Sequence, residues 1–223
     1  MNFENELSRR RFLAMSSALG GIVACGDLTT IFAQQKQTLT EEQVLGPFYP
    51  IHKPLDRDAD LTHLRGRRGS AKGQVMHLMG RVVNPQGKPL AGIKLEIWQA
   101  NTHGRYAHIN DNNTAPLDPN FQGYGTQVTD AKGLFRFKTI KPSAYPIGGG
   151  MSRPPHIHYL VKGRHEALAT QMYFPGEELN AKDSLFQSAA PNQATLLAKV
   201  VPAGKGLEPD SLIVTWDIVL TRG

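Results

Sequence analysis

The chain has 223 residues, of which 40% are hydrophobic and 20% are charged, and its formal net charge is +6. This length suffices for one domain with a substantial core. The sequence has no stripe of lysine and arginine interleaved with aromatic residues, which argues against nucleic-acid binding. Its 15 prolines and 22 glycines favour many turns and short strands over long helices.

Residues 1–33 have the pattern of an export signal. Arg9, Arg10 and Arg11 precede a weakly apolar run at 12–24, which is too short for a membrane-spanning helix of about 20 residues. Paired arginines followed by Phe-Leu resemble the twin-arginine signal, which exports proteins that have already folded. We therefore expect an exported bacterial protein, either periplasmic or anchored to a membrane as a lipoprotein.

The only cysteine of the sequence, Cys25, leaves two alternatives for processing. The run 22–25 resembles a bacterial lipobox, in which the cysteine carries a lipid anchor and becomes the mature N-terminus. Cleavage after Ala33 would instead remove Cys25. In both cases the mature domain has no disulfide, so its stability must come from its core.

The mature chain divides into an arm and a strand-rich domain. Residues 34–72 form a polar, turn-rich N-terminal arm with one compact island at 45–50, while residues 73–223 form the predicted catalytic domain. Apolar side chains alternate along 93–98, which is the period-two signature of a half-buried strand. We expect further strands at 78–83, 133–139, 157–161, 169–174 and 212–220.

These features predict an all-β fold, namely an antiparallel β-sandwich with long functional loops and one short helix. The helix is expected at 192–200, where Leu196 and Val200 would share one helical face. The longest loops, 100–131 and 142–155, are where we expect the chemistry, because loops of that length in a compact domain are usually functional.

His156 and His158 stand two residues apart. On a strand, both side chains would project from one face and could reach one ion, although hydrogen-bonded histidine pairs are also common. Arg153 lies just before them, and Tyr145 lies in the preceding loop beside the glycine triplet 148–150, which allows unusual backbone paths. This constellation favours a metal centre.

Several separated motifs extend this pattern along the chain. They are Trp-Gln-Ala-Asn at 98–101, Gly-Arg-Tyr at 104–106, Ala-Pro-Leu-Asp-Pro-Asn-Phe at 115–121, Thr-Ile-Lys-Pro at 139–142, Tyr-Pro at 145–146, Arg-Pro-Pro-His-Ile-His at 153–158 and Thr-Gln-Met-Tyr-Phe at 170–174. Together they resemble the intradiol ring-cleavage dioxygenases, particularly the protocatechuate 3,4-dioxygenase branch with its iron-bearing beta chain. The resemblance runs from about Leu45 to the C-terminus in the family's order and approximate spacing.

The resemblance implies a non-haem Fe(III) ion bound by Tyr106, Tyr145, His156 and His158. Phenolate oxygen is a hard, anionic donor that suits ferric iron, and imidazole accepts most transition metals. Zinc usually takes cysteine and histidine, and calcium prefers carboxylates and carbonyls, so neither ion explains two tyrosines.

The resemblance also implies the reaction. A catechol-type substrate would displace Tyr145 from the iron, and both atoms of dioxygen would be inserted between the two hydroxyl-bearing carbons, giving a cis,cis-muconate-type diacid. Arg153 would stabilise negative charge beside the ring, and Gln171 would support the metal ligands. Ile147 stands where the iron-bearing protocatechuate chain has a bulky aromatic residue, which indicates a reshaped substrate pocket. Since family members often pair related chains, we expect an oligomer.

Two other interpretations stay open at this point. An exported, non-catalytic β-sandwich binding module would have no need for the tyrosine and histidine set. A zinc or copper protein would use only His156 and His158. His108, two residues after Tyr106, has a spacing that suits a ligand, but the resemblance does not use it, and we expect a structural role. Export favours extracellular phenolic substrates.

Overall fold

The computed structural model describes residues 36–223. The predicted export signal at 1–33, with Cys25, therefore lies outside the described residues. Within the described part of the chain, no helix is long and apolar enough to cross a membrane.

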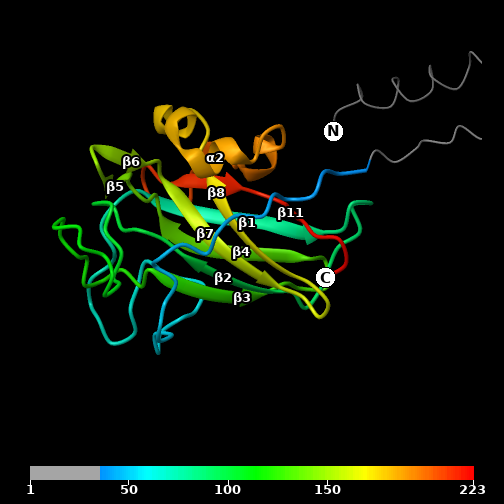
Figure 1. Ribbon diagram of the computed structural model, residues 1–223. Helices are drawn as coiled ribbons and strands as arrows, with labels where there is room; N and C mark the ends of the chain where they lie inside the picture. Colours follow the sequence, from blue (N-terminus) through cyan, green and yellow to red (C-terminus); the bar gives the residue numbers. More distant parts are fainter. Residues whose placement is uncertain (1–35) are drawn as a thin grey trace, which may run out of the picture. The chain divides into compact units, whose positions relative to one another are not determined.

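One sheet is built around strand β1 (Val75–Val83), as Figure 1 shows. On one side β1 pairs in antiparallel fashion with β4 (Leu134–Ile140). On the other side it pairs in parallel with β10 (Leu212–Thr215) and then with β11 (Ile218–Val219). Strand β9 (Lys199–Pro202) completes this sheet by pairing with β10 in antiparallel fashion.

The second sheet has four strands and is antiparallel throughout. In spatial order they are β3 (Tyr124–Val128), β2 (Lys94–Trp98), β7 (His156–Lys162) and β8 (Ala167–Tyr173). A separate hairpin of β5 (Tyr145–Gly148) and β6 (Met151–Arg153) directly precedes β7 along the chain.

The two sheets share one hydrophobic core. Leu78 and Phe137 from the first sheet meet Leu95 and Tyr159 from the second, and none of the four is more than 2% exposed. Because successive residues of a strand point to opposite faces, these side chains cover the inner faces only. Burial of such apolar surface contributes roughly 25 cal/mol per Å² to stability, so this core holds the sheets together.

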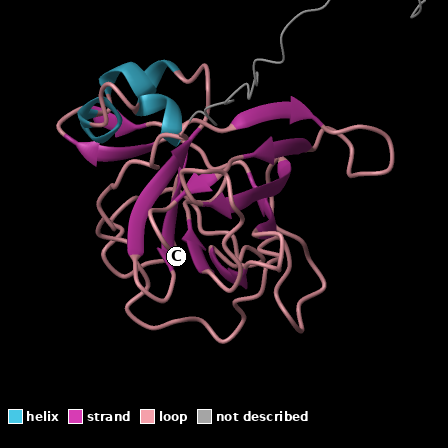
Figure 2. Cartoon of the chain, turned by 90° about the vertical axis from the view of Figure 1, so that its right-hand side faces the viewer, coloured by secondary structure: helices cyan, strands magenta, loops and turns pink. Residues whose placement is uncertain are grey.

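Short helices gather at one end of the sandwich. The single α-helix of the described residues, α2 (Ser184–Ser188), lies between the 3-10 helices η1 (Glu178–Lys182) and η2 (Gln193–Leu196). Asp183 begins α2, because its side chain accepts a hydrogen bond from the Phe186 backbone N–H. Figures 1 and 2 show these helices at the same end as the β5–β6 hairpin.

The predicted all-β sandwich is confirmed, but the helix predicted at 192–200 is wrong. That segment holds only the η2 turn, and Val200 lies in β9, where pairing with β10 outweighs the helical pattern of the apolar residues. A short apolar run does not by itself distinguish helix from strand. The segments expected as loops at 100–131 and 142–155 also contain β3, β5 and β6.

The predicted antiparallel arrangement also has an exception. The strand expected at 212–220 is two strands, β10 and β11, separated by Trp216 and Asp217, and both run parallel to β1. The Trp216 backbone N–H donates to the Met79 carbonyl of β1, so the chain stays attached to the sheet through this break.

Candidate metal centre

Strand β7 presents two histidines on the face opposite the core. Ile157 and Tyr159 point into the core, so His156 and His158 project from the other face. Both imidazoles are buried, with exposed fractions of 2% and 1%. Their Nε2 atoms lie 3.1 Å apart. The strand therefore aims two ring nitrogens at one point.

The loop after β2 carries Tyr106 to the same point. At Gly104 the backbone has a φ of 72°, and an added Cβ would lie 2.2 Å from the Ala144 carbonyl oxygen, so only glycine allows this close approach. Asp111 accepts a hydrogen bond of 2.7 Å from the Tyr106 backbone N–H. These two contacts fix the loop against the start of β5.

Tyr145, the first residue of β5, closes a circuit of four rings. The centroid of the Tyr145 ring lies 5.4 Å from that of Tyr106 and 5.6 Å from that of His156. The His156 and His158 centroids are 4.8 Å apart, and those of His158 and Tyr106 are 6.2 Å apart. Each ring therefore neighbours two others, although the four come from three separate segments of the chain.

Burial keeps all four rings neutral in the metal-free protein. It raises the pKa of Tyr106 well above the usual 10.0, with the neighbouring Tyr145 adding to the rise, and it also raises the pKa of Tyr145. Burial lowers the pKa of both His156 and His158 well below the usual 6.5, helped by the positive charge of Arg153. Nitrogen lone pairs are therefore available at neutral pH.

A carbonyl oxygen sets the tautomer of His156. The Nδ1 atom of His156 lies 2.7 Å from the Pro154 carbonyl oxygen, which can only accept, so Nδ1 carries the proton. The Nε2 atom of His156 is then an acceptor, and it lies 3.1 Å from the Nε2 of His158. This arrangement is typical of a histidine that binds a metal through Nε2.

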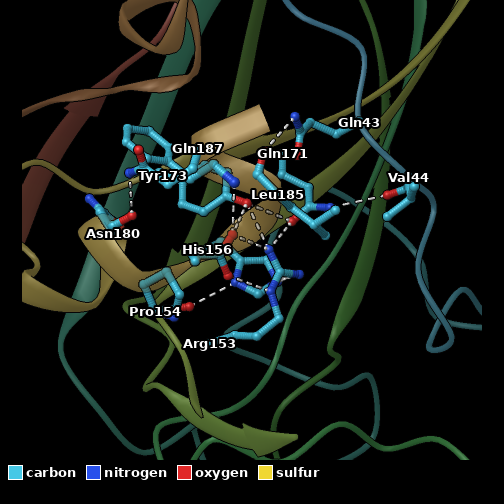
Figure 3. A network of polar contacts seen from close by, with 12 residues as sticks. Gln43, Val44, Arg153, Pro154, His156, Gln171, Tyr173, Asn180, Leu185 and Gln187 are labelled. Carbon is cyan, nitrogen blue, oxygen red and sulfur yellow. Dashed lines mark hydrogen bonds and ion pairs between the residues drawn. The ribbon is translucent and has the colours of Figure 1, made fainter. Parts of the chain in front are cut away.

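Arg153 joins the ring cluster to helix α2 through a buried polar network (Figure 3). Its Nε donates to Asp183 at 2.8 Å, and its Nη2 donates to Gln171 at 2.8 Å and to the Tyr173 hydroxyl at 2.7 Å. Its Nη1 lies 3.1 Å from the Nε2 of His156. Burial alone would lower the pKa of Arg153, but the bond to Asp183 raises it, so the guanidinium is charged and fixed.

Gln171 stands opposite His158 in the β7–β8 pairing. Its side-chain amide donates to the Val44 carbonyl of the N-terminal arm at 3.1 Å, while its carbonyl oxygen accepts from Arg153. Gln171 therefore connects the arginine to the arm and does not belong to the circuit of four rings.

The N-terminal arm contacts three of the four rings, because Phe48 packs against both Tyr106 and Tyr145 and Gly46 lies against His158. Phe48 stacks on Tyr106 with ring centroids 4.5 Å apart. Gly46 lies so close to His158 that an added Cβ would be 3.0 Å from the imidazole Cε1. On its other face His158 stacks on Trp98 at 5.0 Å and an angle of 10°. The arm and β2 thus hold His158 from both sides.

A cavity of about 590 Å³ opens onto this cluster. Tyr145 and Arg153 line it, together with Phe48 from the arm and Ile147 from the hairpin. This volume lies in the range of pockets that bind small molecules. Of the four rings, Tyr145 alone lines this cavity, while Tyr106 lines a smaller one of about 170 Å³.

Comparison with known proteins identifies the family. A family model described as Dioxygenase matches residues 44–222. The protocatechuate 3,4-dioxygenase beta chain of Burkholderia cepacia is 40% identical over 187 residues, which cover 81% of this chain and 80% of that protein. The chain belongs to the intradiol ring-cleavage dioxygenase family. It is an oxidoreductase of that family, as the resemblance of its motifs indicated.

Other intradiol dioxygenases agree in sequence and in fold. The 6-chlorohydroxyquinol 1,2-dioxygenase of Cupriavidus pinatubonensis is 31% identical over 194 residues, 80% of this chain, and this chain spans 65% of that longer relative. The dioxygenase domain of a dioxygenase carbohydrate-binding protein fusion from Streptomyces sp. SirexAA-E superposes with a TM-score of 0.63 at 32% identity. That comparison covers 83% of this chain and all of the Streptomyces chain.

The donor set of this dioxygenase fits a hard, trivalent metal ion. The Tyr106 hydroxyl is buried and has no hydrogen-bond partner within residues 36–223, although it faces a second phenol and two imidazoles. A buried polar group without a partner costs about 1–3 kcal/mol, which a bound ion would offset. In the described part of the chain, no three His, Cys, Asp or Glu side chains are placed to hold a metal. The donors gathered at this point are two imidazoles and two phenols.

The structure brings together the six side chains that the sequence singled out: Tyr106, Tyr145, Arg153, His156, His158 and Gln171. Their roles stay predictions. His108 lies outside the circuit of four rings, since its Nδ1 accepts from the Asn110 backbone N–H and its ring packs on Phe48.

Sequence reasoning missed Asp183, Tyr173 and the contact of Phe48 with Tyr106. The Tyr173 hydroxyl accepts a hydrogen bond from Arg153. Asp183 lies 30 positions from Arg153 along the chain, and no local pattern reports such a contact.

Proposed function

We propose that Tyr106, Tyr145, His156 and His158 bind one Fe(III) ion, and that the enzyme opens catechol-type rings between the two hydroxyl-bearing carbons with dioxygen. The observation that carries this proposal is the convergence of two phenols and two imidazoles on one buried point beside a cavity. Phenolate and imidazole together suit ferric iron better than zinc or calcium.

The bound ferric ion would supply a Lewis-acidic site that chelates the catecholate and makes its ring reactive toward dioxygen. Of the two tyrosines, Tyr145 lines this cavity, so Tyr145 would be the ligand that gives way to a catechol. Burial raises the pKa of Tyr145, so its phenol oxygen would hold a proton taken from the substrate. The four residues thereby bind the metal, and Tyr145 also acts as a base.

Arg153 is positioned to stabilise negative charge on the substrate. Asp183, Gln171 and Tyr173 engage its Nε and Nη2 atoms, which leaves Nη1 pointing at the Nε2 of His156. With that nitrogen bound to the metal, Nη1 would be available to donate to an oxygen of the substrate. In a buried site, such a fixed charge contributes more than it would in water.

The visible absorption spectrum of the purified, iron-loaded protein tests this proposal. We expect a red-brown protein whose band moves to longer wavelength when catechol is added without oxygen. Tyr106→Phe should remove most of the colour. The control is Tyr159→Phe, which removes a hydroxyl that is equally buried on the core face of β7 and should leave the spectrum unchanged.

Two outcomes would favour the rival functions. A protein that stays colourless after ferric loading would support the non-catalytic binding module. A protein whose metal content is unaltered by Tyr106→Phe would support a zinc or copper site built from His156 and His158 alone.

We also propose that residues 1–33 direct export, with a lipid anchor at Cys25 as one form of the mature protein, and that the mature enzyme is oligomeric. The support is the triple arginine before an apolar run. Fractionation of cells that produce the full chain, with Cys25→Ser as the lipidation control, tests export. Retention of the protein in the cytoplasm would contradict it.

Light scattering of the purified protein tests the proposed oligomer.

A further inference from the structure

The cavity at the candidate metal centre continues into a second one. The first has a volume of about 590 Å³ and the second of about 390 Å³. They share Ile147, Arg153 and Leu185 as walls, so they adjoin between the β5–β6 hairpin and helix α2. The first cavity alone lies in the size range that accommodates a drug-sized ligand. One unsubstituted catechol ring would leave most of this space to water.

The walls along this path are apolar and exposed. Ile147 is 53% exposed and Met151 is 61% exposed on the hairpin, and Val44 of the arm is 53% exposed at the first cavity. Leu185 of α2 lies across from the hairpin and lines both cavities. Apolar surface gathered around a cavity is stabilised when an apolar ligand covers it.

The charges along the path are unevenly placed. Among the described residues that line the first cavity, Arg153 is the only cation and Asp111 the only anion. Asp183, Gln171 and Tyr173 already hold Arg153, and Asp111 accepts from the backbone N–H groups of Tyr106 and Asn113. A carboxylate attached directly to the substrate ring would therefore share this cavity with Asp111, and its only cation there would be Arg153, whose Nε and Nη2 are already engaged and whose Nη1 is assigned above to an oxygen of the catechol.

The second cavity is lined by Arg153 and Asp183, which pair with each other, and by one further cation, Lys182. An anionic group could reach this lysine only from the far end of a substituent that passes Ile147 and Leu185. The path from the ring site to Lys182 is therefore an apolar passage with a cation at its outer end.

We propose that the substrate is a catechol whose ring carries an extended apolar substituent, and that this substituent lies between Ile147 and Leu185. A carboxylate is accepted at the outer end of the substituent, near Lys182, and is disfavoured directly on the ring. This inference rests on the proposed function. It separates this chain from its Burkholderia relative, whose name specifies protocatechuate, a catechol with a ring carboxylate.

Four probes test this inference on the iron-loaded full chain. They are catechol, 3,4-dihydroxybenzoate, 3,4-dihydroxycinnamate and 4-phenylcatechol. We expect 4-phenylcatechol and 3,4-dihydroxycinnamate to bind at least about tenfold more tightly than 3,4-dihydroxybenzoate in anaerobic calorimetry, and to show a matching advantage in kcat/KM. Calorimetry reports binding independently of turnover.

Matched variants test where the substituent lies. Ile147→Phe narrows the passage and should lower the kcat/KM ratio of 4-phenylcatechol to catechol by about tenfold. Val201→Phe makes the same kind of change at a side chain that is 52% exposed on β9, outside both cavities, and should leave that ratio unaltered. Lys182→Met should weaken the binding of 3,4-dihydroxycinnamate and leave that of 4-phenylcatechol unchanged.

The outcomes separate the inference from the proposed function. The inference of an extended substituent is wrong, and ring cleavage stands, if the enzyme cleaves catechol but prefers 3,4-dihydroxybenzoate. The same holds if Ile147→Phe and Val201→Phe change the kcat/KM ratio equally. If the iron-loaded protein neither binds nor cleaves any of the four probes, the proposed function itself fails.

Discussion

At the level of single residues, Asp183 makes two interactions. Its carboxylate pairs with the buried guanidinium of Arg153 and also accepts from the backbone N–H that begins helix α2. Side-chain exposure is 9% for Arg153 and 3% for Asp183, so water contributes little to either charge. The position of Arg153 therefore depends on this one carboxylate more than on its neutral partners.

Asp183→Asn should destabilise the fold by about 3 kcal/mol, because it leaves the buried Arg153 without its counter-ion. The proposed ring cleavage should slow as well, since Arg153 is then less firmly held. Urea unfolding and kcat measure the two effects. The control is Asp217→Asn, whose partner Arg81 is 48% exposed, and which should cost about 0–1 kcal/mol. Equal losses in both variants would contradict this account.

Loading the protein with iron should release protons from the two tyrosines. Both phenols are neutral in the metal-free protein, because burial raises the pKa of Tyr106 and of Tyr145. Binding of ferric iron as a bis-phenolate should then release about two protons per site, and Tyr106→Phe should release about one. A pH indicator in weakly buffered solution, with iron added as a chelate, gives the count. Loading without proton release would count against phenolate ligation.

At the level of elements, strand β7 is buried on both faces. One face builds the core, while the other carries the histidines beneath the N-terminal arm. The arm is fastened beside them by a buried carboxylate, Glu96 of β2, which accepts hydrogen bonds from Tyr49 and Tyr124 and pairs with Lys53. Since Tyr49 also packs edge-on against Trp98, this fastening extends to the ring that stacks on His158.

Glu96→Gln should therefore loosen the arm and cost about 3 kcal/mol, because Lys53 loses its partner at a site where the carboxylate is only 2% exposed. Hydrogen exchange at 43–53 should become faster, and iron should be lost to a chelator sooner. Glu208→Gln, which alters a pair with 37% exposure, is the matched control and should cost about 1 kcal/mol or less. Unchanged exchange at 43–53 would mean that the arm is held elsewhere.

The sequence predicts some of these elements well and others not at all. Alternation of apolar residues locates β2, because a strand with one buried face leaves a period-two pattern. The spacing of His156 and His158 on a strand predicts that they share a face. The helix expected at 192–200 fails, because pairing with β10 decides that segment. Tyr106 comes from the resemblance alone, since its approach to Tyr145 depends on the contact of Gly104 with Ala144.

The arm is the clearest case of what a local pattern leaves out. Its composition predicts a polar, turn-rich segment with a compact island at 45–50, yet Phe48 and Gly46 of that island contact three of the proposed ligands. These contacts join residues far apart in the sequence, and no periodicity within the arm reports its partners.

For the whole molecule, carboxylates should make the fold sensitive to acid. Burial alone would raise the pKa of Glu96 and of Asp183, but their cationic partners lower both, and Lys138 lowers the pKa of Glu208 to about 2. These groups bind protons more readily when unfolded, where their pKa values are 4.5 for glutamate and 3.8 for aspartate. Their contribution is complete above about pH 4.5 and is lost as the pH falls towards about 2.

The histidines add an earlier loss in the metal-free protein. Burial lowers the pKa of His156 and His158 below 6.5, so the unfolded chain takes up their protons first as the pH falls. Each histidine should cost up to about 1.4 kcal/mol per pH unit below 6.5. Urea unfolding between pH 7 and pH 3 should show stability falling in two stages. A free energy of unfolding that stays constant from pH 7 to pH 5 would contradict the first stage.

The assembly of the ring cluster also bears on how the protein matures. Its members come from the loop after β2, from β5 and from β7, the arm covers them, and residue 183 beyond β8 fixes Arg153. A nascent chain released only as far as β4 has one of the four rings, and a chain without its arm leaves His158 uncovered. The centre therefore needs the chain from the arm to residue 183, and the colour of the proposed iron site would report chains that have reached the native state.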